Sequence, residues 1–266
     1  MADYDLSKLN DIFDNVEKML IEHSSGIDEF NEYKEIEIKN FTDNDYYWIM
    51  VYVIFYSGFN AETVDKHKAG IEKYFSDYKT AMRYNDDEIE NIKKYKNIIQ
   101  NKRKIESCIS NAKEFYKIVK RFGSFEKYIN YFKPSENDEN LFLFKEDLVE
   151  RFKGIGNVTA YHFMMDIGLD VIKPDRVLMR IFRRLDLVRG EDDIYRGIEV
   201  GRAFAKATGL PIRYIDIMFV SYGQMTSAKK GNTKKWSICS EKNPQCDSCG
   251  IKKYCKYFVQ QKKKQW

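Results

Sequence analysis

The chain has 266 residues, of which 43% are hydrophobic and 15% aromatic, enough apolar material for a sizeable core in one or two domains. The formal charge of +4 is unevenly distributed, because residues 1–50 hold 13 acidic and 4 basic side chains, a net charge of −9 that leaves +13 for the remainder. This is the composition of an ordinary globular protein. A polyanionic partner is expected on its basic part.

Secretion and membrane insertion are not expected. The first apolar positions are diluted by aspartates, which a signal peptide would not tolerate. The longest uncharged stretch, Tyr46–Ala61, is shorter than the ~20 apolar residues of a membrane span. A cytoplasmic location follows. Five cysteines in such a chain, four of them clustered, indicate thiolates that bind a metal rather than disulfides.

Apolar residues recur at spacings of three and four, and glycine and proline are sparse, so the sequence predicts an all-α protein. The stretch 46–61 predicts a buried helix that ends in the turn Ser57–Asn60. Further along, the apolar stripe from Ile105 to Val119 predicts a helix that stops at Gly123. Cys108 lies on that stripe and is expected to be a small buried core residue.

The segment KPSENDE at 133–139 is the best candidate for a crossing between two lobes. After it, a helix is expected to end at Phe152-Lys153, Gly154-Ile155-Gly156 to form a tight turn, and a second helix to begin near Asn157. Glycines let a backbone approach phosphate oxygens, and the amides of the next helix start attract negative charge. A glycine turn between helices is common, however, so this turn alone is weak support for DNA binding.

Asp175 follows Pro174, nineteen positions beyond Gly156, and precedes the apolar segment VLMRIF. Because proline biases the residue before it out of the helical region, Asp175 is expected at or near a helix start. From the residues alone, two interpretations are open: an N-cap that stabilises the helix, or a carboxylate with a chemical role.

The stretch CSEKNPQCDSCGIKKYC at 239–255 holds four cysteines separated by six, two and five residues, namely Cys239, Cys246, Cys249 and Cys255. Four thiolates bind either tetrahedral zinc or an iron-sulfur cluster. Structural zinc sites usually pair two tight cysteine knuckles, and the single two-residue gap here favours the larger cluster; zinc and a metal-free loop remain the alternatives. Residues 226–266 carry 11 lysines against two acids, so Lys252 and Lys253 are expected to face a phosphate backbone rather than only solvent.

The cysteine spacing resembles the 4Fe-4S loop of the endonuclease III and adenine-mismatch branch of DNA glycosylases, and the helices around GIG resemble their helix-hairpin-helix motif. Three other stretches resemble the 3-methyladenine DNA glycosylase I branch. They are SGFNAETVDKH at 57–67, IIQNKRKIESCISNAKEFYKIV at 98–119 and FKGIGNVTAYHFMMDIGL at 152–169. The resemblances imply a two-lobed all-α fold with a C-terminal iron-sulfur loop. Residues 30–134 would form a helical lobe with the base pocket and wedge loop, and 1–29 plus 135–266 a lobe with the hairpin and cluster.

In these glycosylases a catalytic aspartate lies at the position that Asp175 occupies within Lys173-Pro174-Asp175. Its chemistry is clear, because cleavage builds positive charge on the sugar, which an ionised carboxylate stabilises while directing a water molecule. Members that also cut the strand carry a lysine where this chain has Val158. The resemblance therefore implies a glycosylase without lyase activity, with Lys153 as the alternative nucleophile.

The other implied site residues contact DNA or the flipped base. The DNA-binding set is Gly154, Ile155, Gly156, Asn157, Thr159, Phe59, Asn60, Lys252 and Lys253, in which Phe59 or Asn60 would be the wedge and Asn60 alternatively only a helix cap. The base pocket would use Tyr46, Trp48, Tyr52 and Tyr56, against the alternative that they pack in a core. Val53 and Ala61 stand where the 3-methyladenine enzymes carry a base-reading glutamate and a pocket tryptophan, and that family's zinc ligands are missing.

The sequence thus predicts a monofunctional DNA N-glycosylase of base excision repair that removes an alkylated purine such as 3-methyladenine, since aromatic rings attract a cationic base. The alternatives are a glycosylase for a mismatched, deaminated or oxidised base, and a non-catalytic iron-sulfur protein that binds damaged DNA. The expected partner is double-stranded DNA that carries a damaged base, and no membrane partner is expected. The protein is expected to be a monomer that associates with the nucleoid through DNA binding.

Overall fold

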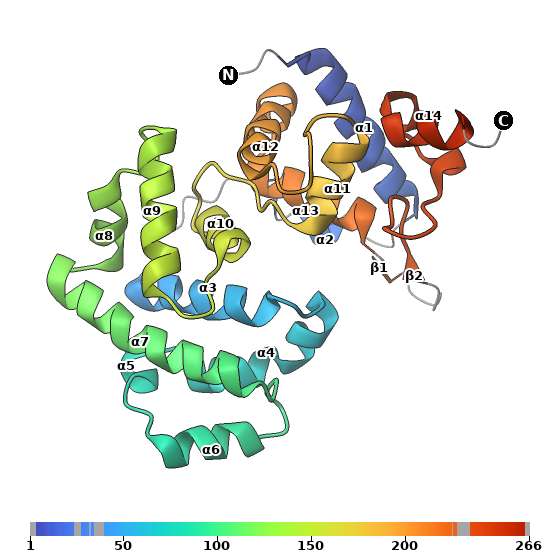
Figure 1. Cartoon of the computed structure of the whole chain (residues 1–266). Coiled ribbons are helices and arrows are strands. Elements are labelled where there is room, and N and C mark those ends of the chain that lie inside the picture. Colours follow the sequence, from blue (N-terminus) through green and yellow to red (C-terminus); the bar gives the residue numbers. More distant parts are fainter. Residues whose placement is uncertain are drawn as a thin grey trace. The chain divides into compact units, whose positions relative to one another are not determined.

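The computed structural model describes residues 4–23, 28–31, 33–34, 40–224, 226–227 and 235–263. Apart from one pair of two-residue strands, the regular structure in these ranges is helical, which confirms the predicted all-α fold (Figure 1). The chain divides into a terminal unit, residues 1–37 with 170–266, and a central unit, residues 38–169. No helix in the described ranges is long and apolar enough to cross a membrane.

The helices of the central unit are α3 (Asp43–Tyr56), α4 (Ala61–Phe75), α5 (Tyr78–Ala81), α6 (Asp86–Lys94), α7 (Lys102–Phe122), α8 (Phe125–Phe132), α9 (Asp138–Arg151) and α10 (Asn157–Asp166). Helix α3 starts at a capping box in which Thr42 and Asp45 bind each other's backbone amides. It is apolar around most of its circumference, and Tyr47, Val51 and Phe55 are fully buried.

The predicted stripe helix is α7. Ile105, Cys108 and Phe115 are fully buried along it, so the expected burial of Cys108 is confirmed. The helix ends at Gly123, as predicted, because Gly123 takes a left-handed conformation with φ of 89° that favours glycine. The phenolic hydroxyl of Tyr47 donates to the carbonyl of Cys108 over 3.1 Å, which fixes α3 against α7.

The boundary between the units differs from the expected crossing at 133–139. That segment only links α8 to α9, where the Asn137 side chain accepts a hydrogen bond from the Asn140 amide and so caps α9. Helices α9 and α10 stay with the central unit because α9 packs on α8 and α10, and α10 packs on α3. The chain passes into the terminal unit only after Leu169.

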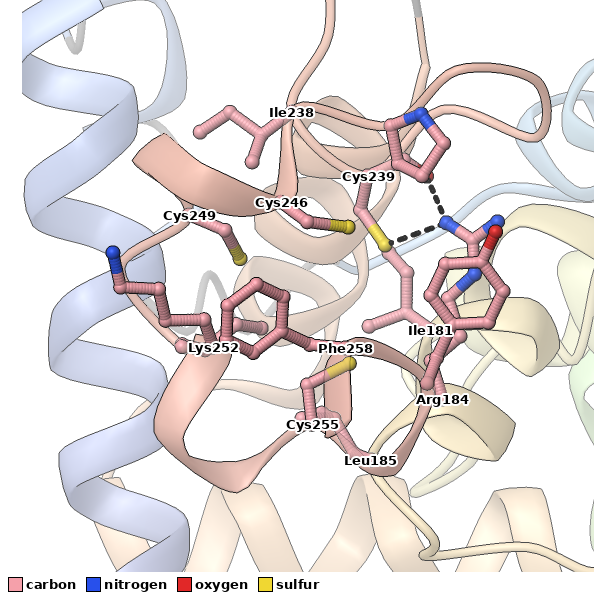
Figure 2. A pocket seen from close by; sticks show the side chains of 13 residues that line it. Ile181, Arg184, Leu185, Ile238, Cys239, Cys246, Cys249, Lys252, Cys255 and Phe258 are labelled. Atoms are coloured by element: carbon pink, nitrogen blue, oxygen red, sulfur yellow. Dashed lines mark hydrogen bonds between the residues drawn. The ribbon is translucent and has the colours of Figure 1, made fainter. Parts of the chain in front are cut away.

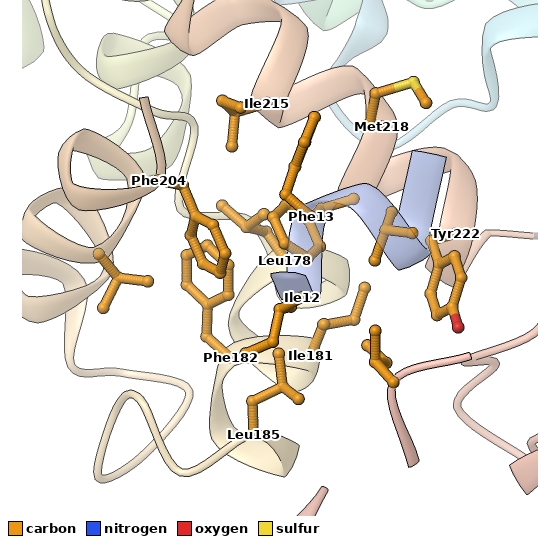
Figure 3. Close-up of a cluster of buried hydrophobic side chains, with 14 of the residues drawn as sticks. Ile12, Phe13, Leu178, Ile181, Phe182, Leu185, Phe204, Ile215, Met218 and Tyr222 are labelled. Atoms are coloured by element: carbon orange, nitrogen blue, oxygen red, sulfur yellow. The ribbon is translucent and has the colours of Figure 1, made fainter. Parts of the chain in front are cut away.

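The terminal unit contains α1 (Leu6–His23), α2 (Asp28–Asn31), α11 (Arg176–Arg184), α12 (Ile194–Thr208), α13 (Ile212–Gly223) and α14 (Lys256–Lys263). Helix α1 packs on α12 and α13, which brings the amino-terminal part of the chain into the core of this unit. Phe13 meets Phe219 edge to face, and Phe219 in turn contacts Phe182 and Phe204. Figure 3 shows Phe13, Phe182 and Phe204 within this core. These ring contacts join α1, α11, α12 and α13 in one core.

The antiparallel pair β1 (Thr226–Ser227) and β2 (Lys235–Trp236) follows α13. The cysteine stretch 239–255 comes after it and contains two short 3-10 turns, η1 (Cys246–Ser248) and η2 (Lys252–Tyr254). Gly250 lies so close to α1 that an added Cβ would stand 2.9 Å from Met19 Cγ and 3.3 Å from the carbonyl oxygen of Asn15. The loop is therefore packed directly on the amino-terminal helix.

Candidate functional site

The glycine turn between α9 and α10 is held by a side chain from α7. Asn111 is buried, and its amide nitrogen donates to the carbonyl of Lys153 while its oxygen accepts from the Lys153 amide, both over 2.8 Å. Gly154 has a φ of 80°, and a Cβ there would touch Ile54 and Ser107 at 3.5 Å. Ile155 is buried and anchors the turn in the core. The predicted hairpin is thus present, and Asn111 of α7 holds its turn in place.

The start of α10 carries no side-chain cap, because the N-cap residue is Gly156. The first amide groups of a helix have no partner within the helix, and they carry its positive dipole end. A Cβ added to Gly156 would find nothing within 4 Å, and Asn157 beside it is exposed, while Thr159 is half-buried. The backbone here has the chemistry and the open space to receive a phosphate oxygen.

Asp175 stands at the N-cap of α11. Its Oδ1 accepts hydrogen bonds from the amides of Val177 and Leu178 over 2.9 and 3.0 Å. Its Oδ2 takes no part in the cap and lies 3.7 Å from Nζ of Lys173. The side chain is 18% exposed. The cap interpretation is therefore correct, and it leaves one carboxylate oxygen for chemistry.

The turn between α3 and α4 contains the two candidate wedge residues. Gly58 is left-handed with φ of 79°, and Phe59 beside it is 36% exposed. Asn60 caps α4, because its Oδ1 accepts from the Thr63 amide over 2.8 Å. Lys104 of α7 donates to the carbonyls of Ile54 and Ser57 and lies 5.4 Å from the Phe59 ring centroid. Burial lowers the pKa of Lys104, a residue that no motif in the sequence singles out.

The predicted base pocket separates into two groups. Tyr46 is only 7% exposed and packs between Phe41 and Phe125, so it is part of the core. Trp48, Tyr52 and Tyr56 are half-buried and form a ladder along α3, with ring centroids 5.3 and 4.8 Å apart.

An acid that the sequence did not single out joins this ladder. The hydroxyls of Tyr52 and Tyr56 both donate to Asp65 Oδ1 of α4, over 3.5 and 2.5 Å, and Lys68 lies 5.4 Å from the Tyr52 ring centroid. Burial and the bond to Asp65 raise the pKa of Tyr56, so its hydroxyl keeps the proton that it donates. The one-turn spacing of the tyrosines was a signal for the ladder, but nothing local pointed to Asp65.

The four cysteines of the loop line one pocket in the terminal unit (Figure 2). Its apolar lining includes Ile181 from α11, Leu185 directly after that helix and Phe258 from α14, and Arg184 also lines it. Burial raises the pKa of the thiols of Cys246 and Cys255, and that of Cys249 to about 11. These thiols therefore hold their protons at neutral pH until a metal displaces them.

The four thiols share one pocket, but they do not form a compact ligand group. In the described ranges, no three side chains among His, Cys, Asp and Glu are arranged to hold one metal ion. Arg184 Nη1 donates to Cys239 Sγ over 3.1 Å, and the Tyr222 hydroxyl lies 3.2 Å from Cys249 Sγ. Such donors suit thiolate sulfurs.

The two lysines expected to contact DNA, Lys252 and Lys253, have partners within the protein. Lys252 Nζ donates to the carbonyl of Asp247, and Lys253 Nζ pairs with Asp11 Oδ2 of α1 over 2.8 Å. The Lys253 side chain is still 60% exposed. A phosphate would compete with Asp11 for this cation, so the expected phosphate contact of Lys253 costs an existing ion pair.

Several solved structures share the fold. Endonuclease III in a non-covalent complex with DNA aligns over 98% of this chain and 100% of its own, with a TM-score of 0.57 and 14% identity. The 8-oxoguanine DNA glycosylase of Thermotoga maritima aligns over 86% of this chain and 98% of its own, with a TM-score of 0.53 and 19% identity. The 8-oxoguanine glycosylase/lyase of Methanocaldococcus jannaschii, in complex with a 15mer DNA, aligns over 78% of this chain and 94% of its own. The TM-score is 0.53 and the identity 20%. A comparison with curated protein sequences gives no match.

The all-helical fold, with its glycine turn between α9 and α10, is that of the helix-hairpin-helix DNA glycosylases. Within this class, the model of the methyladenine glycosylase family matches residues 32–173, which is just over half of the sequence. The chain belongs to the methyladenine glycosylase family. It is therefore a DNA glycosylase of base excision repair.

Proposed function

We propose that the protein is a monofunctional DNA N-glycosylase that hydrolyses the N-glycosidic bond of a flipped alkylated purine, such as 3-methyladenine, and leaves an abasic site. The observation that carries this proposal is the state of Asp175, whose Oδ1 is fixed by two amides of α11 while Oδ2 stays outside the cap. A carboxylate held in this way is preorganised and need not reorient during the reaction.

The reaction requires little else from the side chains. As the bond to the base breaks, the bonding electrons leave with the base and positive charge builds on the sugar. Asp175 stabilises that charge and accepts a proton from the water that attacks the sugar carbon. An alkylated purine is cationic and so leaves readily as a neutral base. The chemistry is then within reach of a single carboxylate.

We assign DNA binding to the backbone at the start of α10 and to a wedge residue in the turn between α3 and α4. The amides at the start of α10 receive a phosphate oxygen, with Gly154, Ile155, Gly156, Asn157 and Thr159 as the contact segment. Support comes from the open space at Gly156 and from the buried anchor of Ile155. Phe59 is the wedge that fills the gap left by the base, because it is exposed while Asn60 is occupied as a cap.

The base is assigned to the ladder of Trp48, Tyr52 and Tyr56. Aromatic faces attract a cationic ring, and the carboxylate of Asp65 adds a negative charge beside the two tyrosines. Tyr46 is left out of this slot because it is buried among other aromatic rings. Both features favour a positively charged alkylpurine over a neutral oxidised base.

The absence of lyase activity follows from the residue at the start of α10. Val158 has no amine, so it forms no Schiff base with the sugar. Lys153 is the alternative nucleophile, and its backbone is pinned by both hydrogen bonds to Asn111. A Lys153→Ala variant that loses strand cleavage would reveal such a role.

The cofactor we propose is a 4Fe-4S cluster held by Cys239, Cys246, Cys249 and Cys255, with zinc as the alternative that the thiolate set also allows. When bound, the cluster cross-links the loop and supplies no part of the hydrolysis. Its effect on this chain is to hold the segment of Lys252 and Lys253 in a fixed conformation beside α1.

The test is incubation of the protein, prepared without oxygen, with end-labelled duplexes that each carry one lesion, read before and after alkali. Cleavage that appears only after alkali, and most strongly with 3-methyl- or 7-methylpurines, is the expected result. Strong excision of a different lesion alone would overturn the assignment of the base. Cleavage before alkali would overturn the monofunctional mechanism. No cleavage on any duplex would point to a non-catalytic DNA-binding protein.

A further inference from the structure

The four cysteine sulfurs do not have equivalent surroundings. Cys239 Sγ accepts from the guanidinium of Arg184 over 3.1 Å, and Cys249 Sγ lies 3.2 Å from the hydroxyl of Tyr222. These two donors come from helices α11 and α13, far from the loop in sequence. Among the described residues, no side chain donates a hydrogen bond to the sulfur of Cys246 or Cys255.

Arg184 is held rigidly in place. It is only 6% exposed, and its Nη1 also donates to the carbonyls of Cys239 and Ser240, while Nη2 donates to the carbonyl of Glu241. The guanidinium carbon lies 4.5 Å from the ring centroid of Tyr257. A cation fixed by this many contacts keeps its charge next to the sulfur without reorienting.

Tyr222 is equally well fixed. Its side chain is fully buried, and its hydroxyl lies 3.2 Å from Cys249 Sγ. A phenolic hydroxyl carries its proton at neutral pH. A metal-bound cysteine has none, so the hydrogen bond must run from the Tyr222 oxygen to Cys249 Sγ.

We propose that Arg184 and Tyr222 are positioning residues that raise the reduction potential of the bound cluster by donating hydrogen bonds to two of its four ligand sulfurs. This inference rests on the proposed 4Fe-4S cofactor. A donor draws electron density from a thiolate sulfur and stabilises the more electron-rich state of the cluster. The step concerned is transfer of one electron between the cluster and an electrode or a soluble mediator, with no bond to the cysteines broken.

The test uses tyrosine variants of the whole protein with the cluster assembled. Tyr222→Phe removes only the oxygen at Cys249. Tyr214→Phe is its matched control, because Tyr214 lies on the same helix, is also fully buried, and donates its hydroxyl to Glu17 rather than to a sulfur. The midpoint potential is read by voltammetry or by mediated titration. We expect it to fall in Tyr222→Phe and to stay at the wild-type value in Tyr214→Phe.

A second pair keeps the test decisive if a tyrosine variant does not fold. Arg184→Lys retains the charge and removes the guanidinium donor to the sulfur. Arg180→Lys is the control, because buried Arg180 donates to the carbonyls of Gly223 and Cys239 and to no sulfur. A lower potential in Arg184→Lys alone supports the inference.

The outcomes separate this inference from the cofactor assignment. Equal potentials in all four variants, with iron content and visible absorbance intact, would overturn the role of the donors and leave the cluster in place. The same shift in a variant and its control would also overturn it, since the effect would then come from the fold. A colourless wild-type protein that contains zinc would overturn both the cofactor and the inference.

Discussion

Helices α10 and α11 begin in opposite ways. At α10 the N-cap is Gly156, which has no side chain to accept a hydrogen bond, and the first amides are left for a ligand. At α11 the N-cap is Asp175, whose Oδ1 accepts from two amides and satisfies the helix from within. An uncapped start attracts an anion from outside, whereas a capped start fixes a carboxylate.

The difference shows how one structural device serves two purposes. Backbone amides carry the binding function at α10, and their position depends on packing beneath the turn. At α11 the corresponding amides serve to orient a side chain, so Asp175 Oδ2, which lies outside the cap and 3.7 Å from Lys173 Nζ, keeps one position. Four predictions sharpen or break this contrast.

The largest effect is expected from Asp175→Asn. Asparagine caps a helix as well as aspartate does, so the stability of α11 should be unchanged. The negative charge is lost, however, and base release should fall by about 100- to 1,000-fold. Single-turnover excision, with DNA binding measured in parallel, checks this.

The matched control is Asp170→Asn, which removes a mostly exposed carboxylate of the same unit, 3.7 Å from Arg202. It should leave excision at the wild-type rate. An Asp175→Asn protein with full activity would remove Asp175 from the mechanism and leave it as a cap only.

The next largest effect should come from Asn111→Ala. The change removes both hydrogen bonds to the backbone of Lys153 beneath the turn. The free energy of unfolding should fall by about 1–3 kcal/mol, because backbone groups lose their partner in a partly buried site. Chemical denaturation measures this loss. Asn130→Ala, on the exposed side of α8, should change stability by much less.

Substitution of the two glycines of the turn should affect different properties, namely stability at Gly154 and DNA binding at Gly156. Gly154→Ala places a side chain at φ of 80° and should cost about 1–2 kcal/mol of stability. Gly156→Ala meets no atom within 4 Å, so it should destabilise less, but its methyl group stands where the phosphate must approach. It should weaken DNA binding by roughly threefold to tenfold. Equal binding by both variants would contradict the assignment of the phosphate to the start of α10.

The smallest effect on stability is expected at the start of α3, where the charged side chain of Asp45 takes part in the capping box. Hydrogen bonds from the side chain and the amide of Thr42 lower the pKa of Asp45 below its ordinary value of 3.8. The stabilisation is therefore complete above the unfolded pKa and is lost as the pH falls through the lower folded value. Asp45→Asn should cost about 0.5 kcal/mol at neutral pH and nothing in strong acid. A loss of the same size at both pH values would show that the charge is irrelevant.

Local signals in the sequence predicted much of this structure. The stripe of α7 and its end at Gly123, the turn at 154–156 and the helix start at Asp175 each depend on residues within a few positions. The base pocket was harder, because α3 is apolar on every side and has no periodicity to separate buried Tyr46 from the half-buried Trp48.

Long-range contacts were beyond local signals. Asn111 reaches a turn 42 residues away, and Asp65 joins the tyrosine ladder from another helix. The boundary between the two compact units also depends on such contacts. The polar segment 133–139 looks like a crossing, but the packing of α10 on α3 decides where the central unit ends.

The most direct test of the account is a single-turnover titration of a methylated-purine duplex with the wild type, Gly156→Ala, Asp175→Asn and the double variant. It yields the dissociation constant and the rate constant of base release from one data set. We predict that Gly156→Ala changes only the dissociation constant, that Asp175→Asn changes only the rate constant, and that the double variant shows both changes unaltered. A wild-type protein that releases no base, or an Asp175→Asn protein that loses binding instead of rate, would contradict it.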